Sequence, residues 1–154
     1  MFKNSILITL LIFTVSCGYE PLFSKKNLIK NSNFSIDKIS FIGDRDVNIK
    51  IKQLLVTFST IKKDKNFTLE IDSKVVKTII AKDIKGDPSQ FNLDIKTIVQ
   101  LDLEGDPLEK ITFNENFKYN NKQDKFEIKR YEREIKQNLA EKISNDLIYK
   151  LANY

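Results

Sequence analysis

Few side chains in this sequence could carry out covalent chemistry. The 154 residues include one cysteine, Cys17, and no histidine. A Ser-His or Cys-His nucleophile would therefore lack the base that takes its proton. Zinc sites that combine cysteine and histidine are excluded for the same reason. We expect no enzyme activity, no catalytic residue, no metal and no cofactor, and we ask whether Cys17 is a core residue, a free thiol or a point of attachment.

A site made of carboxylates alone is compatible with this inventory. The acidic residues that attract attention are Asp44, Asp46, Asp87, Asp106 and Asp124. They stand at expected turns and helix starts, where acids have structural roles. We therefore rank a lipid-tethered carboxylate enzyme or binding protein last among the possible functions.

The segment before Cys17 has the pattern of a secretory signal. Residues 1–5 carry one positive charge, residues 6–15 are an almost unbroken apolar run, and Ser16 is small. Ten helical residues cover about half of the ~30 Å hydrocarbon core of a bilayer, so a membrane-spanning helix is the poorer interpretation. We expect residues 1–16 to be removed as a signal peptide. A lone thiol in an exported chain has no disulfide partner within the chain, which favours attachment at Cys17.

Composition sets the class of the remaining chain. The full sequence has 26 basic and 21 acidic residues, a net charge of +5, and both signs interleaved along its length. A nucleic-acid binder would gather its basic residues on one face, so we expect no nucleic acid as a partner. We expect residues 17–33 to form an acylated terminus and tether, and residues 34–154 to form a single domain.

Hydrophobic periodicity predicts four strands and two helices. The expected strands cover residues 34–42, with a bulge near Asp37, and then residues 67–81, 91–103 and 111–119. One helix is expected from Val47 to Ile61, about four turns, with lysines after its end, and a longer one over residues 128–151. Asp44 or Asp46 could cap the first helix. Two copies of Gly-Asp-Pro, at residues 86–88 and 105–107, are expected to be turns.

The predicted order is β-α-β-β-β-α. This is an α+β fold in which two helices pack on one face of a four-stranded mixed sheet. The first β-α-β step should make its two strands parallel, and the two later steps should be antiparallel hairpins. The other face of the sheet is left to solvent or to a partner.

The residues around Cys17 resemble those of a known family. Residues 13–17, Phe-Thr-Val-Ser-Cys, resemble the lipobox of bacterial lipoproteins, in which the cysteine thiol is acylated and the chain is cut just before it. The string that follows, Cys-Gly-Tyr-Glu-Pro-Leu-Phe at residues 17–23, together with the order of elements, resembles LptE, the lipopolysaccharide-assembly lipoprotein of Gram-negative bacteria. Several acyl chains would hold such a terminus on a membrane permanently.

The resemblance implies a non-enzymatic protein of the outer membrane, anchored by lipid on the periplasmic face. Members of the family plug the lumen of the LptD β-barrel, help it to assemble, and bind lipopolysaccharide. The implied partners are therefore LptD, lipopolysaccharide and, through the anchor, the membrane. The alternative is a lipid-anchored accessory subunit of another outer-membrane complex.

Two sets of residues are candidate contacts. The first set, Tyr19, Pro21, Leu22 and Phe23, follows the anchor and would either pack against the sheet edge or dock on the barrel or on lipid. The second set is Lys82, Lys85, Lys122 and Lys125, which the expected meander places on one rim of the sheet, with Lys129 and Arg130 close by. This rim would contact lipopolysaccharide phosphates. Alternatively, Asp83, Asp87 and Asp124 neutralise it into an ordinary solvated edge.

Overall fold

The computed structural model describes residues 32–60 and 62–154, which belong to one compact unit. Its strands are β1 (Phe34–Gly43), β2 (Lys65–Lys82), β3 (Pro88–Leu103) and β4 (Asp106–Asn120). Its helices are α3 (Arg45–Leu55), the short 3-10 helix η1 (Val56–Phe58), and α4 (Lys125–Ala152). The predicted order, β-α-β-β-β-α, is confirmed.

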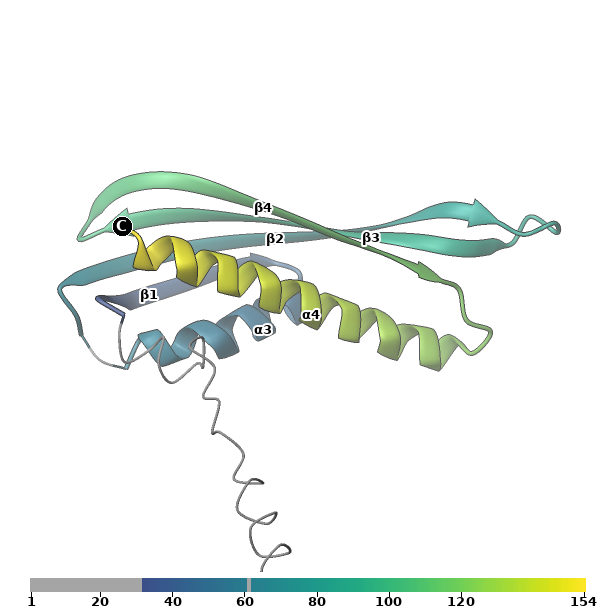
Figure 1. The fold of residues 1–154 in the computed structure, drawn as a ribbon, viewed down its shortest axis with the longest axis horizontal. Helices are drawn as coiled ribbons and strands as arrows, with labels where there is room; N and C mark the ends of the chain where they lie inside the picture. The colour runs from purple at the N-terminus through teal and green to yellow at the C-terminus, as the bar shows by residue number, and fades with distance from the viewer. Residues whose placement is uncertain (1–31, 61) are drawn as a thin grey trace, which may run out of the picture. The chain divides into compact units, whose positions relative to one another are not determined.

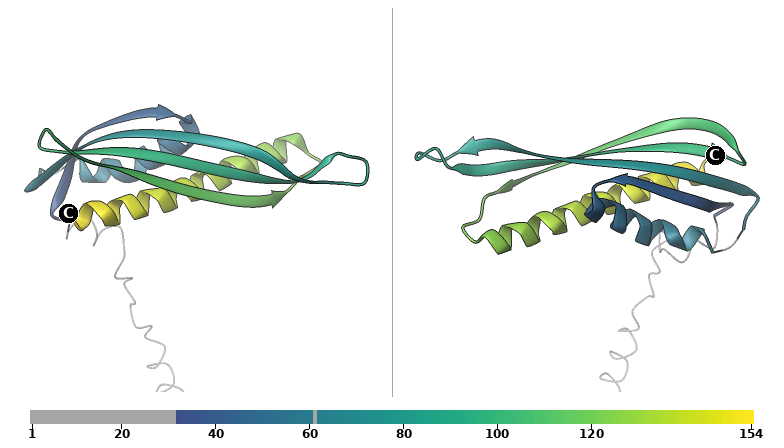
Figure 2. Two further views of the ribbon diagram at one scale, coloured as in Figure 1. Left: turned by 90° about the horizontal axis from the view of Figure 1, so that it is seen from above. Right: turned by 180° about the vertical axis from the view of Figure 1, so that it is seen from behind.

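The sheet has the strand order β1-β2-β3-β4. β1 and β2 are parallel, whereas β2–β3 and β3–β4 are antiparallel hairpins. Among the described residues, α3 and α4 lie on the same face of the sheet, and no described helix lies on the opposite face (Figures 1 and 2). The predicted fold class, two helices on one face of a four-stranded mixed sheet, is therefore confirmed.

The step from β1 into α3 follows the sequence closely. The pairing of β1 with β2 shifts between Ile36 and Lys38, so the bulge predicted near Asp37 is confirmed. The bulge keeps the later apolar residues of β1 on the face that the helices cover. Asp44 caps α3, because its carboxylate accepts hydrogen bonds from the backbone N–H groups of Asp46 and Val47 at 3.0 and 3.1 Å.

The predicted extent of the first helix is wrong. α3 ends at Leu55 and continues only as the 3-10 turn η1, so the expected lysines do not lie in its last turn. The 3-10 turn preserves a three-residue spacing, which keeps Phe58 pointing into the core, where its ring stacks on Phe34 at 5.0 Å. The hydroxyl of Thr57 donates to the carbonyl of Leu54 at 2.9 Å, within the turn that closes the helix. Ile61, the last residue of the predicted helix, lies outside the described residues.

The core lies between the sheet and the two helices. Its largest fully buried side chains are Phe34, Phe67, Ile36, Ile51, Leu55, Leu69, Ile71, Leu93, Ile95, Ile143, Leu147 and Leu151. The alternation predicted for β3 is confirmed by buried residues from Phe91 to Leu101. In β2 the buried face extends only to Ser73, Val75 is half-buried and Ile79 is exposed. The apolar residues from Phe67 to Ala81 are thus buried only in the first half of β2.

The long helix α4 explains where the buried face stops. Its first buried residue is Ile135, ten positions after its start at Lys125. Figure 1 shows the β2–β3 hairpin projecting beyond the first turn of α4. The sheet thus has a half that the helices cover and a distal end that they do not reach.

Candidate functional site

The residues around the expected anchor cannot be placed. Cys17, Tyr19, Pro21, Leu22 and Phe23 lie outside the described residues, as does the whole of the expected signal peptide and nearly all of the tether. The lysine rim, by contrast, lies entirely within the described part of the chain.

The topology brings part of that rim together. Lys82 pairs with Pro88 at the end of the β2–β3 ladder. The side chain of Asn121 donates to the carbonyl of Pro88 at 2.8 Å, and its backbone N–H donates to Ser89, also at 2.8 Å. Lys122 follows Asn121 directly. Asn121 therefore connects the segment that carries Lys122 to the end of the β2–β3 ladder, where Lys82 lies. Lys85 lies further out, in the β2–β3 turn, and Lys125 opens α4 (Figure 1).

Most of these lysines are not neutralised by direct ion pairs. Lys122 is engaged, because its ammonium lies 2.6 Å from Glu127 and 4.8 Å from the ring centre of Tyr131. Within residues 32–60 and 62–154, Lys82, Lys85 and Lys125 form no ion pair within 4.0 Å. Three of the four candidate lysines therefore keep their charge available to a ligand.

The acidic residues near these lysines have structural roles. One carboxylate oxygen of Asp83 accepts the backbone N–H groups of Lys85 and Asp87, both at 2.9 Å, and so closes the β2–β3 turn. Asp124 caps α4 by accepting from the N–H of Phe126 at 2.7 Å. Neither acid, nor Asp87, is ion-paired with a lysine of the rim in the described chain. Their charges still lower the local positive potential, but they leave the ammonium groups free.

The distal end also exposes apolar side chains that the sequence reasoning did not single out. Ile84, at the tip of the β2–β3 turn, is fully exposed, and Phe126, in the first turn of α4, is 85% exposed. Ile79 and Ile80 on the hairpin and Phe117 on β4 are about half exposed. Two features of the sequence could have indicated these exposed side chains. Ile84 stands between Asp83 and Lys85 in an expected turn, and Phe126 precedes the apolar stripe of the last helix.

A polar cluster holds the start of α4 against the distal sheet. Glu132 of α4 lies 2.5 Å from the ammonium of Lys77 on β2, and it accepts a hydrogen bond from the hydroxyl of Tyr119 on β4 at 2.7 Å. The same ammonium lies 3.7 Å from the ring centre of Phe91. One carboxylate thus connects a helix to two strands.

The pKa values of this cluster follow from its contacts. Partial burial favours the neutral form of Glu132. The hydrogen bonds from Lys77 and Tyr119, together with the charge of Lys77, outweigh burial and lower the pKa of Glu132. Burial and the adjacent carboxylate raise the pKa of Tyr119. At neutral pH the cluster is therefore an ionised carboxylate held by an ammonium and a phenol.

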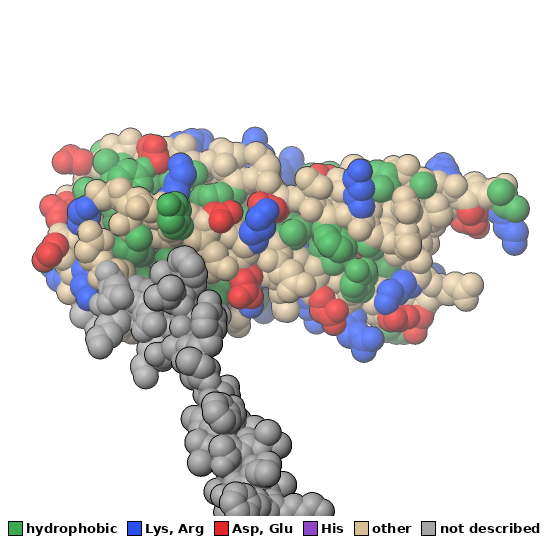
Figure 3. All heavy atoms as spheres, in the orientation of Figure 1, with side chains coloured by type: hydrophobic (Ala, Val, Ile, Leu, Met, Phe, Trp, Pro, Cys, Tyr) green, Lys and Arg blue, Asp and Glu red, His purple; other side chains and the backbone are tan. Residues whose placement is uncertain are grey.

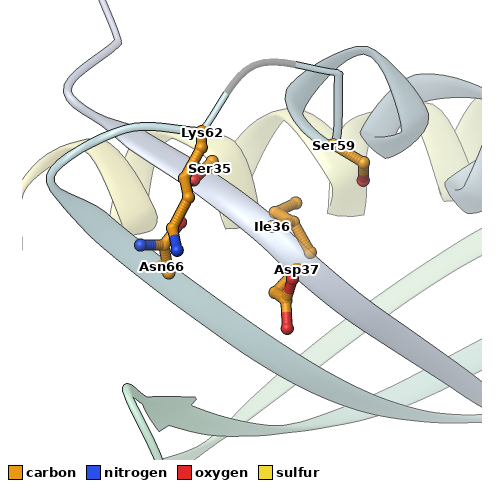
Figure 4. A pocket seen from close by; sticks show the side chains of 6 residues that line it. All are labelled: Ser35, Ile36, Asp37, Ser59, Lys62 and Asn66. Atoms are coloured by element: carbon orange, nitrogen blue, oxygen red, sulfur yellow. Dashed lines mark hydrogen bonds between the residues drawn. The ribbon is translucent and has the colours of Figure 1, made fainter.

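A small polar pocket lies at the other end of the sheet (Figure 4). It is lined by Ser35, Ile36, Asp37, Ser59, Lys62 and Asn66. Its polar groups bond to one another: Ser35 donates to the side-chain oxygen of Asn66 and accepts the N–H of Lys63 at 3.1 Å. The amide of Asn66 donates to the carbonyl of Lys63, also at 3.1 Å. These bonds tie β1 to the loop before β2, which is a structural role.

Two structural features are absent from the described residues. Residues 32–60 and 62–154 contain no group of three or more acidic or cysteine side chains that could hold a metal ion. In the same part of the chain, no helix is both long and apolar enough to cross a bilayer.

The fold is that of solved bacterial lipoproteins. A rare lipoprotein B from Shewanella oneidensis is 10% identical and superimposes with a TM-score of 0.56 over 75% of this chain and 97% of its own. A minor lipoprotein from Acinetobacter baumannii is 13% identical, with a TM-score of 0.53 over 74% of this chain and 92% of its own.

A third solved structure, from Caulobacter crescentus, is 12% identical, with a TM-score of 0.54 over 84% of this chain and 96% of its own. At these identities the likeness establishes a shared fold. No known family matches the sequence, and no curated protein matches it either. The chain therefore shares the fold of these lipoproteins, among them a rare lipoprotein B.

Proposed function

We propose that this chain is a lipid-anchored, non-enzymatic subunit of the outer membrane that plugs an LptD-type barrel, assists its assembly and serves lipopolysaccharide transport. The observation that carries the proposal is the coincidence of two independent features. One is the string Cys-Gly-Tyr-Glu-Pro-Leu-Phe at residues 17–23, in which Cys17 would bear the lipid. The other is a fold shared with rare lipoprotein B.

The surface of the sheet supports a role inside a polar lumen. The face without helices presents Asp72, Lys74, Asp94, Lys96 and Asn114 at alternate positions of three neighbouring strands. Both signs of charge and amides are mixed there. The interior of an outer-membrane barrel is polar and hydrated, so a plug needs a surface of this kind.

The distal lysines support contact with an anionic ligand. Lys82, Lys85 and Lys125 are exposed and without ion pairs in the described chain, and each can act as a point charge toward a phosphate. Lipopolysaccharide carries phosphates near its acyl chains. The same end of the domain offers both ammonium groups and exposed apolar side chains.

The first experiment identifies the partner. The tagged protein is purified from outer membranes under mild detergent, and the material bound to it is identified by mass spectrometry. We expect a large β-barrel and lipopolysaccharide. Recovery of a different complex without that barrel would replace the proposal with the accessory-subunit alternative. A Cys17→Ala variant should be lost from the outer membrane, whereas retention there would contradict the anchor.

The second experiment tests the lysine rim. Lipopolysaccharide binding is measured for Lys82→Glu/Lys85→Glu at several salt concentrations. We expect a loss of about tenfold or more at low salt, shrinking as salt screens the charges. The matched control is Lys74→Glu/Lys96→Glu, which makes the same charge change on the face without helices. Equal losses in both variants would mean that only net charge matters, and the rim would not be a site.

A further inference from the structure

The distal end of the domain divides into two projections. The first is the hairpin prong, residues 79–89, which continues past the last strand-paired residue of β4. The second is the helix prong, residues 122–130, which contains the loop after β4 and the first turns of α4. Figure 3 shows the domain ending in two projections with a recess between them, and Figure 1 identifies their elements.

Each prong carries an apolar side chain at its most exposed point. Ile84 is fully exposed and Phe126 is 85% exposed. Ile79 and Ile80 are adjacent in the sequence, so they project from opposite faces of the hairpin, and both are about half exposed. The hairpin therefore presents apolar side chains on both faces behind its tip.

The exposure of Ile84 is fixed by the turn beneath it. The carboxylate of Asp83 accepts two backbone N–H groups across the turn, and the backbone of Asp83 pairs with that of Asp87 at 2.8 Å. The N–H of Gly86 also donates to the carbonyl of Asp83 at 3.0 Å. With these four hydrogen bonds formed, the turn holds Ile84 outward.

Cations flank both apolar tips. Lys82 and Lys85 lie on either side of Ile84, and Lys125 and Lys129 lie on either side of Phe126. None of these four is ion-paired in the described residues. Apolar side chains bordered by lysines match a lipid interface, in which the apolar groups enter the acyl boundary and the ammonium groups reach anionic headgroups.

We propose that the two prongs insert Ile84 and Phe126 into the acyl boundary of an anionic lipid layer while the flanking lysines contact its headgroups. This would be a second lipid contact, made by the folded domain and separate from the acyl anchor at Cys17. It also goes beyond the plug function, since it assigns the forked end a bilayer surface as its partner.

The test measures how deeply each tip enters a bilayer. The full acylated protein is reconstituted in vesicles of phosphatidylglycerol and phosphatidylcholine, with an environment-sensitive fluorophore on Ile84→Cys or Phe126→Cys. The control sites are Asp106→Cys, at the first residue of β4 at the opposite end of the sheet, and Asn114→Cys, on the face without helices. Cys17 is blocked when acylated, so the wild-type protein should take up no fluorophore.

We expect lipids brominated on their acyl chains to quench the fluorophore at residues 84 and 126 at least threefold more than at residues 106 and 114. The quenching should fall in vesicles of phosphatidylcholine alone. It should also fall in Lys82→Glu/Lys85→Glu, by at least about fivefold in membrane partitioning for each position, because every substitution removes a positive charge and adds a negative one. Lys74→Glu/Lys96→Glu should behave as the parent protein does.

Three results would overturn the proposal. Equal quenching at all four sites would mean that the anchor alone brings the domain to the membrane. Protection of residue 84 only by lipopolysaccharide, with none in phospholipid vesicles, would assign the prongs to that ligand instead. A blue shift without lipid that grows with protein concentration would assign them to a second copy of the chain. Because the barrel is detected by co-purification, failure here is distinguishable from failure of the proposed function.

Discussion

Replacing Gly43 by alanine tests the tightest backbone contact of the fold. Gly43 ends β1 with φ of +94°. A Cβ atom built there would lie 2.1 Å from the carbonyl oxygen of Ser73, whereas ordinary contacts begin near 3.4 Å. The oxygen belongs to the backbone of β2 and accepts the N–H of Asp44 at 2.7 Å. No side-chain rotation can relieve the clash, so the backbone of β1 or β2 must move.

The cost can be divided into two parts. A non-glycine residue in the left-handed region costs about 1–2 kcal/mol. A backbone movement of about 1 Å would also break the bond between Asp44 and Ser73, and leaving buried partners unpaired costs about 1–3 kcal/mol. We therefore expect Gly43→Ala to lose about 2–5 kcal/mol, a large share of the ~5–15 kcal/mol that stabilises a domain of this size.

Gly86→Ala supplies a matched control. Gly86 has φ of +87°, and no heavy atom of the described chain lies within 4 Å of a Cβ built there, apart from its own chain neighbours. This variant should lose only the conformational part, about 1–2 kcal/mol. Both variants are compared by urea unfolding followed by circular dichroism, with similar slopes expected. If the two losses agree within about 0.5 kcal/mol, the contact with Ser73 has no energetic weight and the reasoning is refuted.

Two further predictions concern ion pairs of α4. Asp44 is partly buried, but the hydrogen bond and charge of Lys136 and the hydrogen bonds from the helix N–H groups lower its pKa. The stabilising effect of the ionised Asp44 is therefore present above the pKa of the unfolded state and is lost as pH falls through the pKa of the folded state. Asp44→Asn keeps a capping oxygen, so its stability deficit at pH 7 should shrink in unfolding experiments as pH falls through the lowered pKa of Asp44, and a deficit that does not change with pH would contradict the ionic explanation. For the polar cluster, a double-mutant cycle of Lys77→Met and Glu132→Gln should give a coupling energy of about 1 kcal/mol in unfolding experiments. Lys96→Met, on the opposite face, should show no coupling to Glu132→Gln, and equal coupling would make the effect one of general charge.

Much of the fold could be predicted because local signals and periodicity agreed. The one-residue slip around Asp37 predicted a bulge, and the acids before the first apolar stripe predicted a cap at Asp44 or Asp46, of which Asp44 is the cap. The end of α3 could not be predicted in the same way. Apolar residues three apart satisfy both an α-helix and a 3-10 turn, and it is the stacking of Phe58 on Phe34 that makes the turn favourable.

The site was predictable only in outline. Strand order placed Lys82 and Lys122 at the same end, since antiparallel neighbours alternate their ends. The sequence could not reveal that Asp83 is committed to backbone N–H groups, nor that α4 stops short of the hairpin. The first fact depends on the geometry of the β2–β3 turn, and the second on how far a helix of 28 residues extends over strands of 15 to 18. For that reason the exposed Ile84 and Phe126 were not singled out.

The helices cover only part of the sheet, so the residues that stabilise the fold differ from those that are exposed for binding. The buried residues of α4 all lie from Ile135 onward, where the helix faces the core. Its first turns contact the sheet mainly through Glu132 and the rings of Tyr119 and Tyr131, which meet edge to face at 6.0 Å. These polar and aromatic contacts hold the first turns of α4 in place without burying the apolar side chains of the distal end. The distal end can therefore keep apolar and cationic side chains exposed, because the half of the domain that supplies the folding energy does not depend on burying them.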